Sequence, residues 1–183
     1  DKDNSNYGTA CVLDISNNII TPGTPMVFES AAAEDVYLER LSATKLILTF
    51  SSSGSNGQAY VLSVSGTTIT LGAESAVFLD GSKATYQAVY GLSETLVVVA
   101  CRDNAAGDYG VAVAGSISGT TITWGTQVDL TGNAADHLAV IGMSATTALI
   151  TFFDSNSTQT AVIATCSGTG NRTISLGTAV VFA

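Results

Sequence analysis

The feature that most constrains the fold is an eight-residue segment that recurs at nearly even spacing. "SGTTITWG" at 118–125 has near copies in "SGTTITLG" at 65–72, "GNRTISLG" at 170–177 and "SNNIITPG" at 16–23. We call this segment the octet. A second landmark, "LSAT" at 41–44, "LSET" at 92–95 and "MSAT" at 143–146, recurs every 51 residues. Two independent landmarks that keep one period predict an array of repeated units.

Each repeat is expected to contain four β-strands. In the repeat at 84–130, strand-like segments occupy 84–93, 95–103, 108–118 and 120–130, and Gly, Asn, Asp and Ser gather between them. Val, Ile, Thr and Tyr dominate the segments, and no stretch of 10–18 residues has a helical period. The sequence therefore predicts an all-β chain.

The second strand of each repeat distinguishes between two all-β folds. Its centre, at Leu46–Phe50, Leu96–Ala100 and Leu149–Phe153, is apolar on nearly every position, which predicts burial of both faces in the middle of a sheet. A β-propeller provides this environment because each four-stranded blade lies between two others. A β-trefoil, the alternative, has barrel strands with one face in the core and should show alternation. We therefore expect a β-propeller.

The octet is interpreted as a folding signal that joins the third strand to the fourth. Ser-Gly suits a tight turn with positive φ, and Gly72, Gly125 and Gly177 fit a bend or bulge in the fourth strand. The repeat resembles the "SGTTITFG" type of propeller repeat of bacterial, metagenomic and phage-associated proteins, over essentially the whole chain. The octet is also similar to the Asp-box hairpin of sialidases, but it lacks the Asp, so no sialidase chemistry follows from it.

The count of strands predicts association. The chain starts at a third strand and ends at a fourth, which gives a half-blade at 1–30 and blades at about 31–81, 82–132 and 133–183. The orphan hairpin at about 7–29 carries apolar side chains at Ala10, Val12, Ile19, Val27 and Phe28. Three and a half repeats do not close a ring of whole blades, so we expect self-association, with two copies supplying the strands of seven blades, or the remainder of a larger propeller.

Charge and cysteines exclude some classes of function. Among 183 residues, 15 Asp and Glu outnumber 6 Lys and Arg, for a net charge of −9. This balance argues against nucleic-acid partners and anionic membrane surfaces, and no apolar run is long enough for membrane insertion. Cys11, Cys101 and Cys166 lie in apolar segments and are read as buried free thiols. An extracellular or virion-associated location is slightly favoured.

The candidate ligand-binding residues follow the second strand of each repeat. Acidic and amide side chains recur there, and tyrosines begin the third strand. The set comprises Asp3, Asn4, Tyr7, Asp103, Asn104, Tyr109, Asp154 and Ser155. Loops at equivalent places of a repeat array should lie on one face, where they could hold sugar hydroxyls. The alternative reading is that these Asp residues cap their own turns.

Other chemistry has little support in the sequence. Calcium suits carboxylate loops, but Ser52 replaces Asp at the equivalent place and no calcium-loop motif occurs, so neither a cofactor nor a metal site is expected. His137, the single histidine, stands at the start of a first strand, where Asp35 and Tyr86 stand in the other repeats, and is read as a surface residue. Trp124 is read as a core residue. No catalytic residue is predicted.

Three hypotheses about function follow. The first is a non-catalytic binding or adhesion module that recognises a glycan or a protein ligand through repeated blade loops. The second is a purely structural scaffold in an extracellular or virion assembly. A glycan-active enzyme is third, because no set of catalytic groups converges in the sequence.

Overall fold

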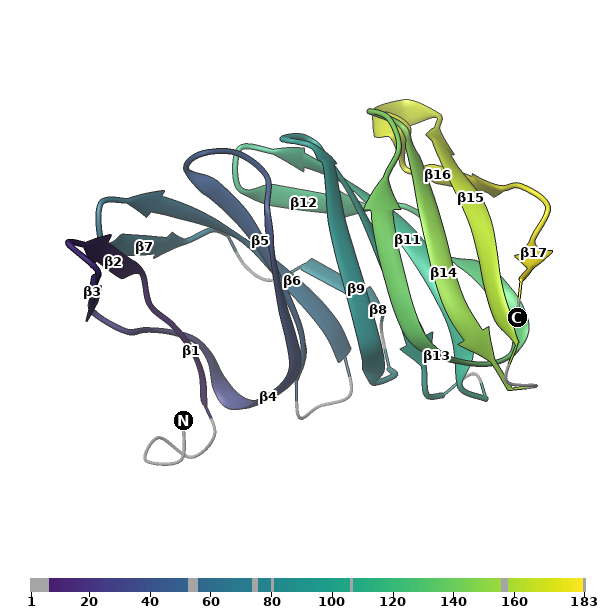
Figure 1. Cartoon of the computed structure of the whole chain (residues 1–183), viewed down its shortest axis with the longest axis horizontal. Coiled ribbons are helices and arrows are strands. Elements are labelled where there is room, and N and C mark those ends of the chain that lie inside the picture. The colour runs from purple at the N-terminus through teal and green to yellow at the C-terminus, as the bar shows by residue number, and fades with distance from the viewer. Residues whose placement is uncertain are drawn as a thin grey trace.

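The chain folds into a curved row of β-sheets (Figure 1). This computed structural model describes residues 7–52, 56–73, 76–79, 81–105, 107–155 and 158–182. Within those residues, no helix has the length and apolarity needed to cross a membrane. The helical element η2 is a short 3-10 turn at Thr169–Asn171.

The strand pairings divide the described residues into a half-unit with two strands, the third and fourth of the repeat, followed by three units with four strands each. A strand that is interrupted along its length carries two labels, and β4 and β13 each continue from the fourth strand of one unit into the first strand of the next. The half-unit contains β1 (Tyr7–Ala10), β2 (Leu13–Ser16), β3 (Ile19–Pro22) and the first half of β4 (Met26–Arg40). Unit one contains the second half of β4, then β5 (Lys45–Ser52), β6 (Asn56–Ser65), β7 (Thr68–Leu71) and β8 (Ala76–Leu79).

The next two units repeat this order. Unit two contains β9 (Ala84–Ser93), β10 (Leu96–Asp103), β11 (Tyr109–Ser118), β12 (Thr121–Trp124) and the first half of β13 (Val128–Gly142). Unit three contains the second half of β13, then β14 (Thr147–Asp154), β15 (Gln159–Ser167), β16 (Thr173–Leu176) and β17 (Val180–Val181). All pairings are antiparallel. The four strands expected at 84–130 are confirmed, with the fourth strand broken between β12 and β13.

The units stack face to face and converge on their first strands. The first strands of successive units lie in contact, β4 with β9 and β9 with β13. Three apolar cores fill the joints between successive units. Sheets that stack face to face and converge on their first strands form a β-propeller, not the barrel of a β-trefoil.

Strand β10 shows why its sequence is continuously apolar. Leu96, Val98 and Ala100 belong to the core shared with unit three, whereas Val97, Val99 and Cys101 belong to the core shared with unit one. All six side chains are buried. Because both faces of a middle blade are covered, alternation disappears from its sequence.

The same expectation is wrong for β14 of unit three. Ala148, Ile150 and Phe152 are buried against unit two, but Leu149, Thr151 and Phe153 are only partly buried. The sequence is as apolar as in the other units, but among the residues that the structure describes no following unit covers this face. We call the side of each unit that points toward the next unit in sequence its forward face, and the opposite side its backward face.

The half-unit also departs from expectation. Phe28, one of the apolar residues of the orphan hairpin, is buried against Phe50 of unit one, with ring centroids 5.3 Å apart. Cys11, predicted to be buried, is exposed, because none of the described residues forms a unit on the backward face of the half-unit. The other two cysteines are buried and free, as predicted.

The octet builds the tip and the bend of each unit. Gly66 and Gly119 have φ of 56° and 63° in their turns, and Asn17 and Asn171 take the same conformation. At the bend, the last glycine of each octet donates its amide hydrogen to a carbonyl of the third strand. These bonds join Gly23 to Val12, Gly72 to Val61, Gly125 to Ala114 and Gly177 to Ile163, at 2.7–2.9 Å. The predicted bend is therefore confirmed.

Candidate functional site

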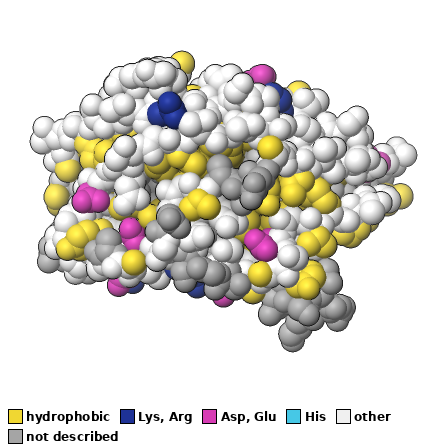
Figure 2. Space-filling view, turned by 180° about the vertical axis from the view of Figure 1, so that it is seen from behind, with side chains coloured by type: hydrophobic (Ala, Val, Ile, Leu, Met, Phe, Trp, Pro, Cys, Tyr) yellow, Lys and Arg dark blue, Asp and Glu magenta, His cyan; other side chains and the backbone are white. Residues whose placement is uncertain are grey.

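The candidate site lies on the edge of the molecule formed by the loops between second and third strands and by the connections that enter each first strand. We call this edge the lower rim, after its place in Figure 1. In Figure 2, seen from behind, most of the Asp and Glu side chains in view lie in the lower half of the molecule. The repeated topology explains the gathering, since equivalent loops of every unit reach the same edge.

A β-bulge at the start of each first strand turns one side chain toward this rim. Between Glu34 and Tyr37, two residues of β4 stand opposite one residue of β5, and β9 and β13 repeat the irregularity. The first bulged residue is Asp35, Tyr86 or His137, with φ of 48°, 50° and 52°. Such φ values are uncommon for residues other than glycine. Because three different side chains share one strained backbone, the repeat fold imposes the bulge.

The bulges of units two and three place aromatic rings side by side. The ring centroids of Tyr86 and His137 lie 5.4 Å apart, and those of His137 and Phe153 lie 6.0 Å apart. We call Tyr86, His137 and Phe153 the aromatic row. Tyr86 is 39% exposed. The guanidinium carbon of Arg102 lies 5.7 Å from the centroid of the Tyr86 ring, within the range of a cation–π contact.

Arg102 links the two units electrostatically. Its Nη2 lies 2.7 Å from Asp108 Oδ2, and its Nη1 donates to Asp136 Oδ1 at 2.5 Å. Burial of the guanidinium lowers the pKa of Arg102, but the hydrogen bonds to both carboxylates outweigh this and hold the pKa above its usual value. The group therefore stays charged and stays balanced by two acids.

The joint between units one and two has its own ion pair at the rim. Lys83 contacts Glu34, and this hydrogen bond raises the pKa of Lys83. Desolvation raises the pKa of Asp35, although Lys83 opposes the shift. Both ion-pair partners are well exposed, so the pair stabilises the joint by about 1 kcal/mol at most.

Asp103 and Asn104, both predicted from sequence, lie in the loop of unit two. Asp103 is 5% exposed, and its carboxylate accepts hydrogen bonds from the Ser82 hydroxyl and the Ala105 amide. These contacts fit the turn-capping interpretation. Asn104 is exposed and accepts a hydrogen bond from the Thr85 hydroxyl at 2.8 Å. Asp103 therefore holds the loop together while Asn104 lies at the surface.

Asp154 and Ser155 lie in the equivalent loop of unit three. Asp154 Oδ1 accepts a hydrogen bond from the Thr158 amide at 3.1 Å, and Ser155 is exposed. Asp154 also lines an open depression of about 340 Å³, with Asp136, His137 and Phe153 as the other lining residues. The structure thus brings a predicted acid together with two rings of the aromatic row.

The two predicted tyrosines are separated along the rim. Tyr109 is half-buried beside Gly107 in unit two, whereas Tyr7 lines a cavity of about 470 Å³ in the half-unit. Asp3 and Asn4 lie outside the described residues. In the part of the chain that the structure describes, no group of three or more His, Cys, Asp or Glu residues is placed to hold a metal ion.

Sequence reasoning missed three of the residues that shape the rim. Arg102, Tyr86 and Asp136 come together across the joint between units two and three. The available signal was the shared repeat position of Tyr86 and His137, which by itself does not indicate a ligand. No sequence pattern indicated the ion pairs of Arg102, because one partner, Asp108, lies in a loop and the other, Asp136, lies in a strand of the next unit.

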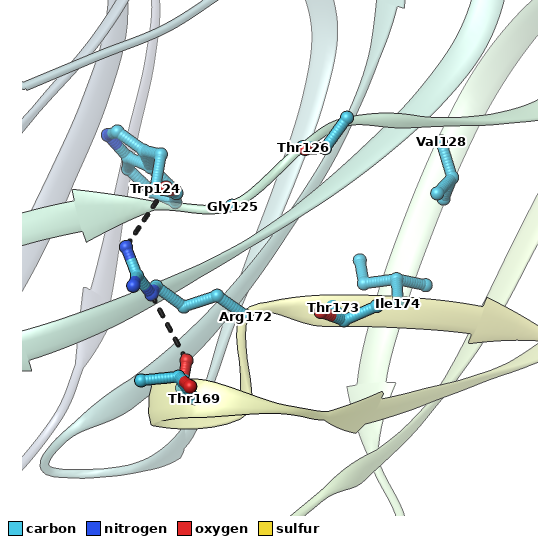
Figure 3. Close-up of a pocket in the computed structure, with 8 residues that line it drawn as sticks. All are labelled: Trp124, Gly125, Thr126, Val128, Thr169, Arg172, Thr173 and Ile174. Carbon is cyan, nitrogen blue, oxygen red and sulfur yellow. Dashed lines mark hydrogen bonds between the residues drawn. The ribbon is translucent and has the colours of Figure 1, made fainter.

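A second cleft, at the opposite edge, belongs to the same joint. Figure 3 shows Arg172 extending from the octet turn of unit three toward Trp124 of unit two. Arg172 donates to the carbonyls of Thr169 and Trp124 at 3.3 and 3.4 Å. The Trp124 ring packs edge-on against Phe78, so its predicted core role is confirmed. These contacts make the cleft part of the joint between the units.

Comparison with known proteins gives one informative match. No family model matches the chain, and no curated protein matches it. A solved structure of the NanB sialidase from Streptococcus pneumoniae, in complex with 2-[(3-chlorobenzyl)ammonio]ethanesulfonate, is similar with a TM-score of 0.55 and 17% sequence identity. The similarity covers 82% of this chain and 25% of the sialidase chain. At this identity the likeness shows the fold alone, and the chain is accordingly a β-propeller array.

Proposed function

We propose that the chain is a non-catalytic binding module that recognises glycans at the lower rim, with its best-formed site at the depression beside His137. The observation that carries the proposal is the composition of this depression. Two aromatic rings, His137 and Phe153, stand beside the carboxylates of Asp136 and Asp154. Sugar rings stack on aromatic faces, and sugar hydroxyls donate hydrogen bonds to carboxylates. The similar structure is a sialidase, which favours a glycan over other ligands.

The charges favour a neutral glycan. Arg102 is balanced by Asp108 and Asp136, and Asp154 adds a further acid at the depression. The whole chain carries a net charge of −9. These negative charges would repel a ligand that carries a carboxylate or sulfate, whereas they would not repel a neutral hexose.

A binding role is favoured over catalysis because the acids at the depression serve the fold. One oxygen of Asp136 is engaged by Arg102, and one oxygen of Asp154 is engaged by the Thr158 amide. Equivalent loops would each bind weakly, and several of them together would supply avidity. A structural scaffold without a ligand is the alternative.

A glycan array followed by calorimetry tests the proposal. We expect neutral glycans to bind and sialylated or sulfated ones not to bind, with the same result with and without calcium. The variant His137→Asn should weaken binding at least about tenfold because it removes a stacking ring, while Asn tolerates the positive φ. Asp35→Asn is the matched control, since it changes the equivalent bulge outside the depression, and it should bind like the wild type.

Two results would contradict the proposal. Absence of binding to any neutral glycan at millimolar concentration would favour the scaffold. Equal loss in the His137 and Asp35 variants would show that the depression is not the site. Release of a chromophore from aryl glycosides by the purified chain would favour the enzyme hypothesis instead.

A further inference from the structure

The last glycine of each octet, which we call the bend glycine, indicates how successive units pack together. The backbone φ at these glycines is not positive, so local conformation does not require glycine there. A neighbouring octet turn lies too close for a larger residue. A Cβ atom on Gly23 would lie 2.8 Å from the Thr67 oxygen, and one on Gly125 would lie 1.9 Å from the Arg172 oxygen. A Cβ atom on Gly72 would lie 2.9 Å from Thr120 Cβ of the next unit and 2.5 Å from the Val61 oxygen of its own unit.

The three approaching residues hold one position in the repeat. Thr67, Thr120 and Arg172 are each the third residue of the octet of the following unit. Every joint inside the chain therefore uses the same contact, in which the tip of one octet presses on the bend glycine of the unit before it. A glycine at the bend therefore indicates a unit whose bend is packed against the octet turn of the following unit.

Gly177 is a bend glycine against which no octet turn packs among the described residues. It holds the bend position of unit three, yet a Cβ atom there would lie 3.6 Å from the nearest atom, Ile163 O, which is an ordinary contact. Nothing within the described residues of the chain demands glycine at this place. A unit packed against the forward face of unit three would demand it.

The two uncovered faces at the ends of the row are apolar in the same way as the internal joints. The forward face of unit three presents Ile141, Leu149, Phe153, Ile163, Val180 and Phe182. The backward face of the half-unit presents Cys11, Leu13, Ile15, Ile20 and Val27. Ile15 is 70% exposed. In Figure 2, hydrophobic side chains reach the surface toward both ends of the molecule.

Residues on these two faces hold the same repeat positions as residues that are buried in an internal joint. Leu149 and Ile163 hold the positions of Ile47 and Val61, which are fully buried in the joint between units one and two. Ile15 and Ile20 hold the positions of Ile117 and Ile122, which belong to the same core. The two open faces are therefore the two halves of one joint that the chain already forms internally. Contiguous exposed apolar side chains of this kind mark interaction surfaces in soluble proteins.

We propose that a second copy of the chain binds head to tail, with its half-unit on the forward face of unit three. In this joint Asn18, the third residue of the first octet, presses on Gly177 of the other copy, as Arg172 presses on Gly125. Cys11 then faces the same core as Ile163, since these residues hold the positions of Val113 and Val61, which belong to one core between units one and two. The contact is heterologous, so a closed pair forms it twice.

Sedimentation velocity tests the joint through a change that the folded monomer tolerates. The wild type should form dimers or larger species between 1 and 100 μM. Gly177→Ala should weaken this association at least about tenfold, since the added methyl group meets Asn18, and its far-UV spectrum should stay unchanged. Gly132→Ala is the matched control, because a Cβ atom there meets nothing within 4 Å. It should associate like the wild type.

Cross-linking tests the orientation. In the Ile163→Cys variant, oxidation should link Cys11 of one copy to the new thiol of another and give a covalent dimer, whereas Ser144→Cys at an exposed turn should not. A wild type that remains monomeric at 100 μM overturns the proposal. So does association that survives Gly177→Ala unchanged, or a disulfide that joins the two new thiols of a pair of Ile163→Cys chains. Glycan binding by Gly177→Ala tests the proposed function separately, because this substitution does not alter the residues that line the depression beside His137.

Discussion

Replacing Gly125 by Ala tests whether the joint between units explains the repeated bend glycine. The new Cβ atom would lie 1.9 Å from the carbonyl oxygen of Arg172, and that oxygen belongs to the backbone of unit three. Since such atoms do not approach within about 3.0 Å, the turn of unit three would have to move by about 1.1 Å. Figure 3 shows the two segments as neighbours.

The expected loss of stability follows from this displacement. Overpacking of this kind costs about 1–3 kcal/mol, and strain on the Gly125–Ala114 hydrogen bond of 2.9 Å adds about 0.5–1.5 kcal/mol. Replacing Gly by Ala also restricts the unfolded chain, which returns about 0.4–1 kcal/mol. The net expectation is a loss of about 0.5–4 kcal/mol in the free energy of unfolding.

Gly177→Ala is the internal control for this prediction. It makes the same chemical change at the same repeat position, but the nearest atom is 3.6 Å from the added carbon. Its stability should equal that of the wild type or exceed it by up to about 1 kcal/mol. Urea denaturation below 1 μM protein, where association is negligible, measures both variants. Equal losses at the two positions would refute the reasoning, because the bend itself would then require glycine.

Three further predictions concern burial and charge. In the native, dissociated chain below about 1 μM, Cys11 alone should react with a thiol reagent at pH 8, because burial raises the pKa of Cys101 far above its usual value; rapid labelling of a second thiol would contradict the packing. Phe50→Ala should cost about 3–5 kcal/mol, since this ring is 0% exposed, whereas Phe153→Ala should cost about 1 kcal/mol or less; urea denaturation would show comparable losses if the forward face were covered within one chain. Burial raises the pKa of Asp35 in the folded state, so the folded chain binds this proton more tightly than the unfolded chain and loses stability as pH rises from 3.8. Asp35→Asn should therefore gain stability relative to the wild type between pH 3 and pH 7, and a pH-independent difference would contradict this assignment.

The sequence by itself determined the repeat, the strands and the way in which units stack. Local signals sufficed because the octet encodes its own turn and bend, and because the apolar run at Leu96–Ala100 requires cover on both faces. The four strands of unit two appear where they were expected. The reading of Asp103 as a turn cap was also within reach, since an Asp after a strand commonly binds its own loop.

Only the tertiary structure decided which faces remain open and which side chains meet at the rim. Leu149 and Val98 have the same repeat position and similar chemistry, so no local pattern separates the partly buried residue from the buried one. The contact of Arg102 with Asp136 joins strands of two units, and its geometry depends on how the sheets fan apart. The left-handed backbone at Tyr86 and His137 is likewise imposed by the bulge. Such pairings depend on three-dimensional packing, because the residues involved are far apart in sequence.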